Sequence, residues 1–272
     1  MPVIELCRMT YTYGVPINQH PQLITPPDRT VLWRYMDFAR FVQMLETQSL
    51  WFSRMDQLDD PLEARFTDAE IEYLRSQAPP PGNPGRSMHE TFVGMSHFMR
   101  VTTYLNCWRA GAKESLAMWD LYGKGSGIVA VKTTVEQLRN ELNSIDTRMF
   151  LGQVRYVDWN SASWDNNSLV MCARKDSCYE HESEVRVIIW EDSTLSSTAL
   201  FPQEETVIKP FGQRTVIDPP FGINMPINLS RMITEVVIGP RERPWVFGLV
   251  TNVLTRYSLH VPIVVSDRLK PR

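Results

Sequence analysis

Residues 30–55 read TVLWRYMDFARFVQMLETQSLWFSRM, and this stretch decides the fold class. Its first seven residues, Thr30–Met36, are rich in β-branched and aromatic side chains, which is typical of a strand. Asp37 can then cap a helix. Apolar residues recur after it at the spacing of one helical face, namely at Phe38, Phe41, Val42 and Leu45. A second strand, Ser49–Met55, follows, so the stretch predicts a strand, a helix laid on the sheet, and a strand.

Further helices and strands alternate along the rest of the chain. Thr67 and Glu70 form the pattern of a capping box, which starts a helix through about Ser76. Apolar periodicity predicts other helices at 88–99, 115–122, 134–142 and 245–257. Strands are expected at 103–108, 127–132, 150–157, 184–190, 235–238 and 261–265. This order predicts an α+β protein with a central, mostly antiparallel or mixed sheet and flanking helices.

The domain organisation is expected to be simple. The 272 residues are enough to bury a substantial core. We expect a single α+β domain over residues 31–266, preceded by a Pro-rich N-terminal surface extension at 1–30. The Pro/Gly-rich stretch 79–87 is expected to be a surface linker, and 267–272 a short tail.

Composition narrows the class of protein. The formal net charge is −3 and no basic run is present, so charge does not support nucleic-acid binding. No apolar stretch approaches the roughly 20 residues of a membrane helix, and no signal-peptide pattern is present, which predicts no membrane contact and a cytoplasmic location. The four cysteines form no C-x-x-C pair and the five histidines show no metal spacing, so no zinc site is predicted. The oligomeric state does not follow from the sequence.

Three carboxylates lie close together directly after the second predicted strand, at Asp59, Asp60 and Glu63. Pro61 stiffens the turn between them. Carboxylates are the hard oxygen ligands that a divalent cation such as Mg²⁺ prefers. In the alternative interpretation, Asp60 caps a turn or a helix whose first position is Pro61. Both interpretations stay open at this point.

A second acidic group leads into the strand expected at 184–190. Alternate residues of a strand share a face, so Glu182, Glu184 and Arg186 would point the same way. Two carboxylates on one face repel each other, which favours one of them keeping its proton near neutral pH. A pair of one acid and one anion suits catalysis. The alternative is a solvated strand face whose charges pair across the sheet.

Two further features could contact a ligand. Trp119 and Tyr122 are three residues apart on a predicted helix, so their rings are either a wall for a nucleobase or nicotinamide ring, or a core pair. The glycine-rich stretch 123–127 lacks the phosphate-loop pattern and precedes a strand, which indicates a turn. Arg34 lies between two aromatic residues of a strand. Its guanidinium suits phosphate or carboxylate, and a structural salt bridge is the alternative.

These segments, taken in order, resemble the bacterial domain-of-unknown-function family 2971. The matching stretches are LWRY at 32–35, LWFS at 50–53, LDDPLE at 58–63, CW at 107–108, MWDLY at 118–122, Lys175 with YEHESEVR at 179–186, and ITEVVIGP at 233–240. The D-P-x-E and E-x-E-x-R motifs are the most specific of these. The chain departs from the family pattern at Asp59, Leu121 and Val185, where the family usually has Asn, His and Trp. The family has no settled activity, so the resemblance implies that the two acidic segments recur as a set and share one site.

The layout is also similar to that of ADP-ribosyltransferases, which have a strand bearing Arg, a helix, a strand ending in Ser and a later strand with Glu-x-Glu. This similarity implies that Arg34 holds the phosphates of NAD and that Ser53 orients the nicotinamide ribose. It also implies that Trp119 or Tyr122 stacks on the ring. Glu184 would then stabilise an oxocarbenium-like transition state.

Three functions therefore stay open, and only two of them are enzymes. The first is an NAD-consuming ADP-ribosyltransferase or glycohydrolase with Glu182, Glu184 and Arg186 as catalytic residues and a small nucleotide-type ligand. The residues expected to bind that ligand are Arg34, Ser53, Asp59, Asp60, Glu63, Trp119 and Tyr122. The second is a Mg²⁺-dependent nuclease or phosphodiesterase built on the same carboxylates, with Arg34 or Lys175 assisting. The third is a non-catalytic binding module in which the acidic groups are structural.

Overall fold

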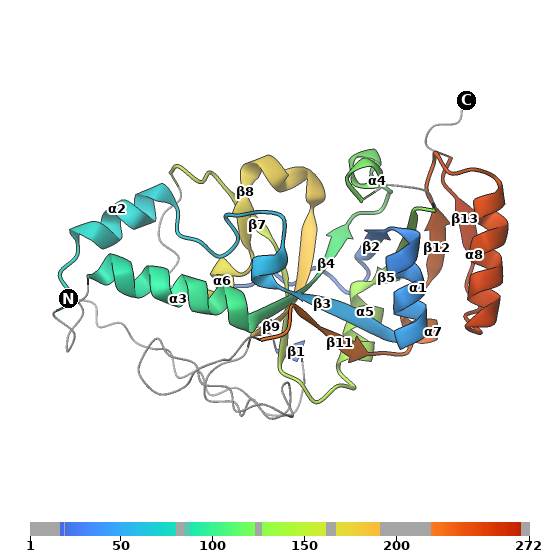
Figure 1. Ribbon diagram of the computed structural model, residues 1–272, viewed down its shortest axis with the longest axis horizontal. Helices are drawn as coiled ribbons and strands as arrows, with labels where there is room; N and C mark the ends of the chain where they lie inside the picture. The colour runs from blue at the N-terminus through green and yellow to red at the C-terminus, as the bar shows by residue number, and fades with distance from the viewer. Residues whose placement is uncertain are drawn as a thin grey trace.

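The computed structural model describes residues 17–18, 20–79, 85, 87–122, 127–161, 167–190 and 219–267. In this part of the chain, ten strands form one open mixed sheet with helices around it, which confirms the predicted α+β class (Figure 1). Its main path runs through β1 (Ile17–Asn18), β6 (Met149–Gln153), β9 (Glu184–Trp190), β4 (Thr103–Ala110), β2 (Val31–Met36), β5 (Val129–Thr134), β12 (Glu235–Ile238) and β13 (Ile263–Val265). Beside this path, β3 (Ser49–Arg54) pairs with β4 and with β11 (Gly222–Pro226). A separate pair joins β7 (Arg155–Val157) to β8 (Arg174–Asp176).

The opening unit β2–α1–β3 forms as its sequence pattern predicts. Helix α1 (Phe38–Thr47) begins at Asp37, whose side chain accepts a hydrogen bond from the Arg40 backbone N–H at 2.8 Å. It ends at Gln48, which takes the left-handed conformation with φ of 46° and turns the chain into β3. The apolar face of α1 is buried through Phe41 and Leu45, so the helix packs on the sheet.

β2 and β3 meet opposite ends of the same strand. Leu32 and Trp33 of β2 pair with the C-terminal end of β4, whereas Ser53 and Arg54 of β3 pair with its N-terminal half. The two strands therefore diverge along β4. Between them, the Trp51 carbonyl accepts hydrogen bonds from side chains rather than from a neighbouring backbone. The angle between β2 and β3 is where the pocket described below lies.

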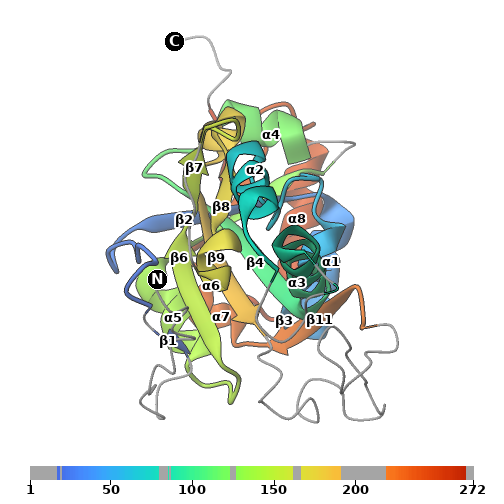
Figure 2. The same cartoon turned by 90° about the vertical axis from the view of Figure 1, so that its left-hand side faces the viewer.

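Helices gather at the two ends of the sheet. At one end, α2 (Asp68–Ser76) packs against α3 (Met88–Thr102), as Figure 2 shows from that side. The predicted capping box of α2 is confirmed, because Thr67 and Glu70 bond each other's backbone N–H. At the other end, α8 (Trp245–Arg256) lies against β13. Shorter helices complete the described part: α4 (Leu116–Tyr122), α5 (Val135–Leu142), α6 (Ser168–Met171) and α7 (Leu229–Met232).

Two sequence expectations near the site are wrong in detail. The strand expected at 150–157 is divided at Val154 into β6 and β7, because the backbone leaves β9 there for β8. The Val154 N–H still bonds the Glu184 carbonyl, whereas the Arg155 N–H bonds the Ala173 carbonyl. Glu182 lies in the 3₁₀ helix η2 (Ser177–Glu182) and not on a strand. Ser183 then has φ of 44°, so the alternation expected for Glu182 begins only at Glu184.

Other expectations fall mostly outside the described residues. They are the linker at 79–87, the glycine-rich turn at 123–127 and the tail at 267–272. Within residues 1–30, strand β1 pairs in parallel with β6, so this much of the N-terminal segment joins the sheet. The surface extension and the single domain stay predictions.

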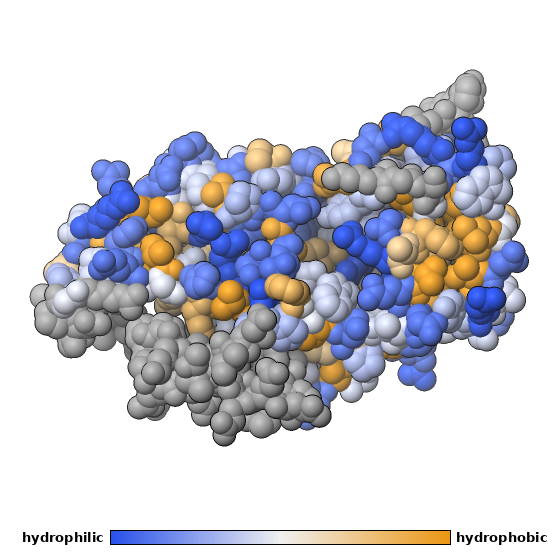
Figure 3. Space-filling view, viewed as in Figure 1, coloured by the Kyte–Doolittle hydropathy of each residue, from blue (hydrophilic) through white to orange (hydrophobic). Residues whose placement is uncertain are grey.

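The surface carries apolar side chains at the α8 end. Trp245 and Phe247 of α8 and Val264 and Val265 of β13 are exposed. Apolar residues gather at this end of the molecule in the space-filling view (Figure 3). None of the helices in the described ranges combines the length and the apolar character required of a membrane span.

Candidate functional site

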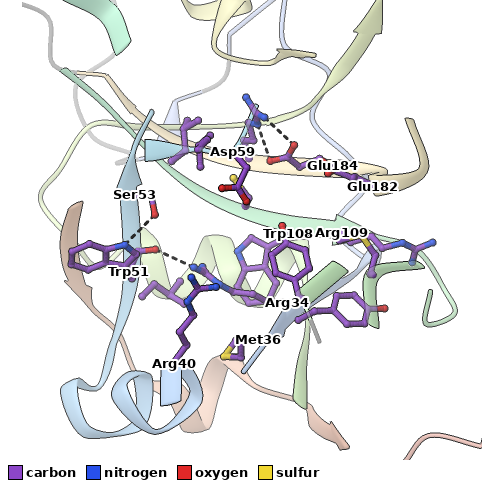
Figure 4. A pocket seen from close by; sticks show the side chains of 18 of the residues that line it. Arg34, Met36, Arg40, Trp51, Ser53, Asp59, Trp108, Arg109, Glu182 and Glu184 are labelled. Carbon is purple, nitrogen blue, oxygen red and sulfur yellow. Dashed lines mark hydrogen bonds and ion pairs between the residues drawn. The ribbon is translucent and has the colours of Figure 1, made fainter. Parts of the chain in front are cut away.

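A pocket of about 700 Å³ lies in the angle between β2 and β3. Its walls come from β2, α1, β3 and β4 and from the segments around residues 57–63 and 175–186 (Figure 4). Nine residues proposed from the sequence line it, namely Arg34, Ser53, Asp59, Asp60, Glu63, Tyr122, Glu182, Glu184 and Arg186. The structure thus brings both acidic segments and Arg34 to one concave surface.

Arg186 is the centre of the acidic side of the pocket. Its side chain is completely buried on β9. Nη2 lies 2.6 Å from Glu63 Oε1 and 2.9 Å from Glu184 Oε2, while Nη1 lies 2.7 Å from Glu63 Oε2 and Nε lies 2.9 Å from Glu184 Oε1. Nη1 also donates to the Cys172 carbonyl at 2.8 Å. All five N–H donors of the guanidinium are used, so its plane is held firmly between two carboxylates.

Lys175, at the centre of β8, supplies the second cation. Its Nζ lies 2.7 Å from Glu182 Oε2, 3.7 Å from Glu184 Oε2 and 3.8 Å from Glu63 Oε1. Nζ also lies over the Tyr179 ring, 4.4 Å from its centroid. Glu182 therefore joins the group through Lys175, although it does not lie on the strand.

Three buried carboxylates share two cations, and the pKa values of Glu63 and Glu184 move apart. Burial, with the charge of Glu184 adding to it, raises the pKa of Glu63 in spite of Arg186. Burial also acts to raise the pKa of Glu184. The charge and hydrogen bonds of Arg186 outweigh that effect, so the pKa of Glu184 lies below its ordinary value. Glu184 is consequently ionised at neutral pH, and Glu63 is the carboxyl of this pair that gains a proton first.

Two tyrosine hydroxyls and a thiol near Glu184 keep their protons. The Tyr156 hydroxyl accepts a hydrogen bond from the Glu184 backbone N–H at 2.8 Å. Burial raises the pKa of Tyr156, Tyr122 and Cys107, and the negative charge of Glu184 raises each of them further. Because the Cys107 thiol keeps its proton, it does not serve as a thiolate nucleophile.

Residues 58–64, which follow the 3₁₀ helix η1 (Met55–Gln57), form a turn and not a helix. Asp60 is 3% exposed, and its Oδ1 accepts a hydrogen bond from the Leu62 N–H at 2.8 Å. The turn over residues 61–64 closes at Ala64, whose φ of 51° lies in the left-handed region. This geometry carries Glu63 into the interior to meet Arg186. The other Asp60 oxygen, Oδ2, is buried and has no hydrogen-bond partner among the residues that the structure describes.

Positive charge occupies the other side of the pocket. Arg34 and Arg40 line it there, apart from Glu182 and Glu184 (Figure 4). Arg34 is half-buried, and its Nη2 donates to the Trp51 carbonyl at 3.2 Å. Its Nη1 is buried and meets no acceptor in the described part of the chain. The salt-bridge alternative is wrong for these residues, since Arg34 forms no ion pair with any of them.

The environment of Arg34 leaves its charge uncompensated. Burial lowers the pKa of Arg34, and the positive charge of Arg40 adds a smaller effect in the same direction. The guanidinium lies over the Trp108 ring, 5.8 Å from its centroid. An arginine keeps its proton in proteins, so the pocket contains a cation that lacks a partner anion within the described ranges.

Aromatic residues line the pocket as well. Trp51 is 40% exposed, and its Nε1 donates to Ser53 Oγ at 3.0 Å, while Tyr122 is 37% exposed. Trp119 does not line the pocket. Its ring packs edge-on against Tyr35 at 4.8 Å, and its Nε1 donates to Glu114 at 2.7 Å. Trp119 therefore has the core position that its spacing also allowed.

Several lining residues were not proposed from the sequence as ligand contacts. They are Arg40, Trp108, Arg109 and Tyr179. Trp108 and Arg109 follow Cys107 directly on β4, so the aromatic and basic character of that strand was the signal available for finding them. Arg40 lies on the exposed face of a helix, where a basic residue predicts nothing by itself.

The acidic side does not have the donor set of a metal site. In the ranges that the structure describes, no three His, Cys, Asp or Glu side chains are grouped so as to hold a metal ion. Arg186 already occupies both oxygens of Glu63 and of Glu184, and Lys175 binds Glu182. These carboxylates do not fit the Mg²⁺ site of the second functional hypothesis.

Comparisons with known proteins give a structural likeness and no family. No family model matches the chain, and no curated protein matches it. Among solved structures, the chain is similar to the Thermus sp. 2.9 DarT in complex with ADP-ribosylated ssDNA. The sequence identity is 10%, the match covers 90% of this chain and 98% of that one, and the TM-score is 0.36. At this TM-score the likeness carries no argument about fold or activity.

Proposed function

We propose that the pocket binds a dinucleotide of the NAD class and breaks the bond between its nicotinamide ring and ribose, as an ADP-ribosyltransferase or a glycohydrolase does. One observation carries the proposal: the two sides of the pocket have opposite charge. Carboxylates outnumber cations around Glu184, and a cation without a partner anion among the described residues, Arg34, lies on the other side. NAD has the matching polarity, because its pyrophosphate is anionic and its nicotinamide ring is cationic.

The basic side suits a pyrophosphate. A buried donor without an acceptor costs about 1–3 kcal/mol, and a phosphate oxygen next to Arg34 would remove that cost. The planar guanidinium can contact two phosphate oxygens at once. Arg40 lies on the same side and forms an ion pair with Asp37, 3.6 Å away, which also lines the pocket. The volume of about 700 Å³ lies within the range of small-ligand pockets.

The acidic side suits the chemistry at the ribose. When the glycosidic C–N bond breaks, its electron pair goes to the ring nitrogen, and positive charge moves from the ring to the ribose. A fixed and ionised carboxylate stabilises that charge. Glu184 is the carboxylate whose pKa is held low by Arg186, so it is an anion at neutral pH. Water or an acceptor group then bonds to the ribose carbon and gives up a proton.

Incubation of the purified protein with NAD tests the proposal. We expect the protein to release free nicotinamide, which chromatography measures. We also expect it to bind NAD, which calorimetry measures. Glu184→Gln should lower kcat about 10²- to 10⁴-fold while NAD still binds, because only stabilisation of the transition state is lost. A matched control is Glu70→Gln, which removes a buried carboxylate that lies outside the pocket.

Binding and turnover together decide the outcome. A protein that binds no NAD by calorimetry, and whose melting temperature NAD does not raise, contradicts the proposal. Nuclease or phosphodiesterase activity that a chelator abolishes would instead support the Mg²⁺-dependent alternative. Turnover of NAD that is unchanged in Glu184→Gln would remove the assigned role of that carboxylate.

A further inference from the structure

Glu63 is the member of the acidic group that reaches it from the greatest distance along the chain. It lies 123 residues before Arg186, on the turn at 61–64, and is 1% exposed. The turn is closed by Asp60, whose Oδ1 binds the Leu62 N–H, and it ends in a residue with positive φ. Asp60 and Ala64 therefore fix the conformation of the turn, and the turn directs the Glu63 carboxylate into the core.

The contacts run in an unbroken series from Glu63 to the pocket. Both oxygens of Glu63 bind Arg186, at 2.6 and 2.7 Å, and Arg186 in turn binds both oxygens of Glu184, each at 2.9 Å. A guanidinium is a rigid plane, so its orientation transmits the position of one carboxylate to the other. The Cys172 carbonyl holds the remaining Nη1 donor.

We propose that Glu63 is a positioning residue, which acts through Arg186 to hold the carboxylate of Glu184 in one orientation toward the pocket. This inference rests on the proposed function, because it assigns the stabilised charge to Glu184. Glu63 does not need to touch the ligand for this role. Its two bonds to Arg186 keep the guanidinium from rotating away from Glu184 while positive charge develops on the ribose.

The charge of the group distinguishes this role from simple stabilisation. A second buried pair, Arg174 with Glu70, is also bidentate, at 2.7 and 2.8 Å, and among the described residues Glu70 is the carboxylate that binds Arg174. Arg186 has two carboxylates as partners, and one would be enough to neutralise it. The additional carboxylate, Glu63, does not improve the charge balance. Burial raises its pKa, and the charge of Glu184 raises it further. What it adds is geometric constraint on Arg186.

The kinetics of Glu63→Gln across the acid and neutral pH range test the inference. Gln keeps the size of the side chain but offers one acceptor and no charge. We expect kcat to fall about 10- to 100-fold with KM for NAD little changed, as for other residues that orient a catalytic group. In the unmodified enzyme, the acid limb of kcat should follow the raised pKa of Glu63, which loses its hold on Arg186 when it is protonated. That limb should move to lower pH in Glu63→Gln, where the pKa of Glu184 determines it.

The controls separate this inference from the proposed function. In Glu70→Gln, the acid limb of kcat should stay where it is in the unmodified enzyme. If Glu63→Gln does not fold, carboxyl NMR of the unmodified protein still decides, because the titration of Glu63 must coincide with the acid limb. An unmodified enzyme that consumes NAD, with an acid limb that does not follow Glu63 or that is unchanged in Glu63→Gln, overturns the positioning role alone. A protein that does not consume NAD overturns the proposed function itself.

Discussion

Two buried arginines, on strands that are consecutive in the chain, have different numbers of carboxylate partners in the described part of the structure. Arg174 of β8 and Arg186 of β9 are both at most 1% exposed, and each is bound by a glutamate that follows β3 in the chain. Within the described ranges, Arg174 binds one carboxylate, Glu70, and neither of the two lines the pocket. Arg186 binds Glu63 and Glu184, beside Lys175, and all of these residues line the pocket.

The difference separates a structural pair from a candidate site. A buried pair of one cation and one anion is neutral and needs no further partner. It matters for the fold because each member prevents the other from being a buried, unpaired charge. A buried group with more carboxylates than cations keeps perturbed pKa values, which is typical of functional sites. The chain maintains this imbalance next to a cavity, opposite an arginine that has no anion within the described ranges.

The largest expected effect on stability belongs to the balanced pair. Glu70→Gln leaves Arg174 as a buried cation without its carboxylate, and this should lower the free energy of unfolding by about 3–5 kcal/mol. Gln at this position still completes the capping box of α2, so the loss reports the ion pair and not the cap. Urea unfolding measures it.

A double variant provides the control for this prediction. Glu70→Leu with Arg174→Met removes both charges at once and should recover most of the lost stability, since a well-packed apolar pair can replace an ion pair. A Glu70→Gln protein within about 1 kcal/mol of the unmodified protein would show that the two arginines do not differ as described.

Arg34→Met, unlike Glu70→Gln, should weaken ligand binding without lowering the stability of the protein. It removes a cation that has no anionic partner among the described residues, so the free energy of unfolding without ligand should stay the same or rise. The dissociation constant for NAD should increase about 10- to 100-fold, which corresponds to the loss of a hydrogen bond to a charged group. Calorimetry with NAD and urea unfolding without it measure the two effects, and a large loss of stability would mean that Arg34 is a structural residue.

The dependence of stability on pH should show the imbalance at Arg186. The pKa of Glu63 is raised in the folded state, so its contribution is present below its unfolded pKa and is lost as pH rises through the folded pKa. We compare the free energy of unfolding of the unmodified protein with that of Glu63→Gln. As pH rises from the unfolded to the folded pKa of Glu63, the first minus the second should decrease by about 1.4 kcal/mol per pH unit. Urea unfolding at a series of pH values gives the difference, and a difference that rises with pH would contradict the direction.

The contribution of Glu184 to the free energy of unfolding should change with pH in the opposite direction. Its pKa is lowered in the folded state, so its contribution is present above the unfolded pKa and is lost as pH falls through the folded pKa. The windows of Glu63 and Glu184 thus lie on opposite sides of the ordinary glutamate pKa.

The smallest effect is expected at the surface. Arg241 and Asp120 form an ion pair whose side chains are 63% and 52% exposed. Arg241→Ala should change the free energy of unfolding by less than about 1 kcal/mol, because solvent and salt screen exposed pairs. A loss as large as that of Glu70→Gln would mean that burial does not explain the contrast between the pairs.

Local patterns predicted the elements that depend on few neighbouring residues. The unit β2–α1–β3 and the capping box at Thr67 formed as expected, since helix caps and apolar periodicity act within one or two turns. The strand expected at 150–157 is interrupted, because the Arg155 N–H bonds the Ala173 carbonyl, and the pattern of the segment itself does not reveal that partner. The short elements β8, β11, α6 and α7 were not predicted, because segments this short have little periodicity of their own.

The sequence by itself determined which side chains are available for chemistry and the α+β class of the fold. Those side chains are the two acidic segments, Arg34 and the aromatic residues near them. The tertiary structure alone decided that Glu63 meets Arg186 across 123 residues, that Glu182 joins the group from the 3₁₀ helix η2, and that Trp119 packs in the core. The physical reason is range. Secondary structure follows from contacts along the chain, whereas an ion-pair group follows from the register of strands and from turns that bring distant residues together.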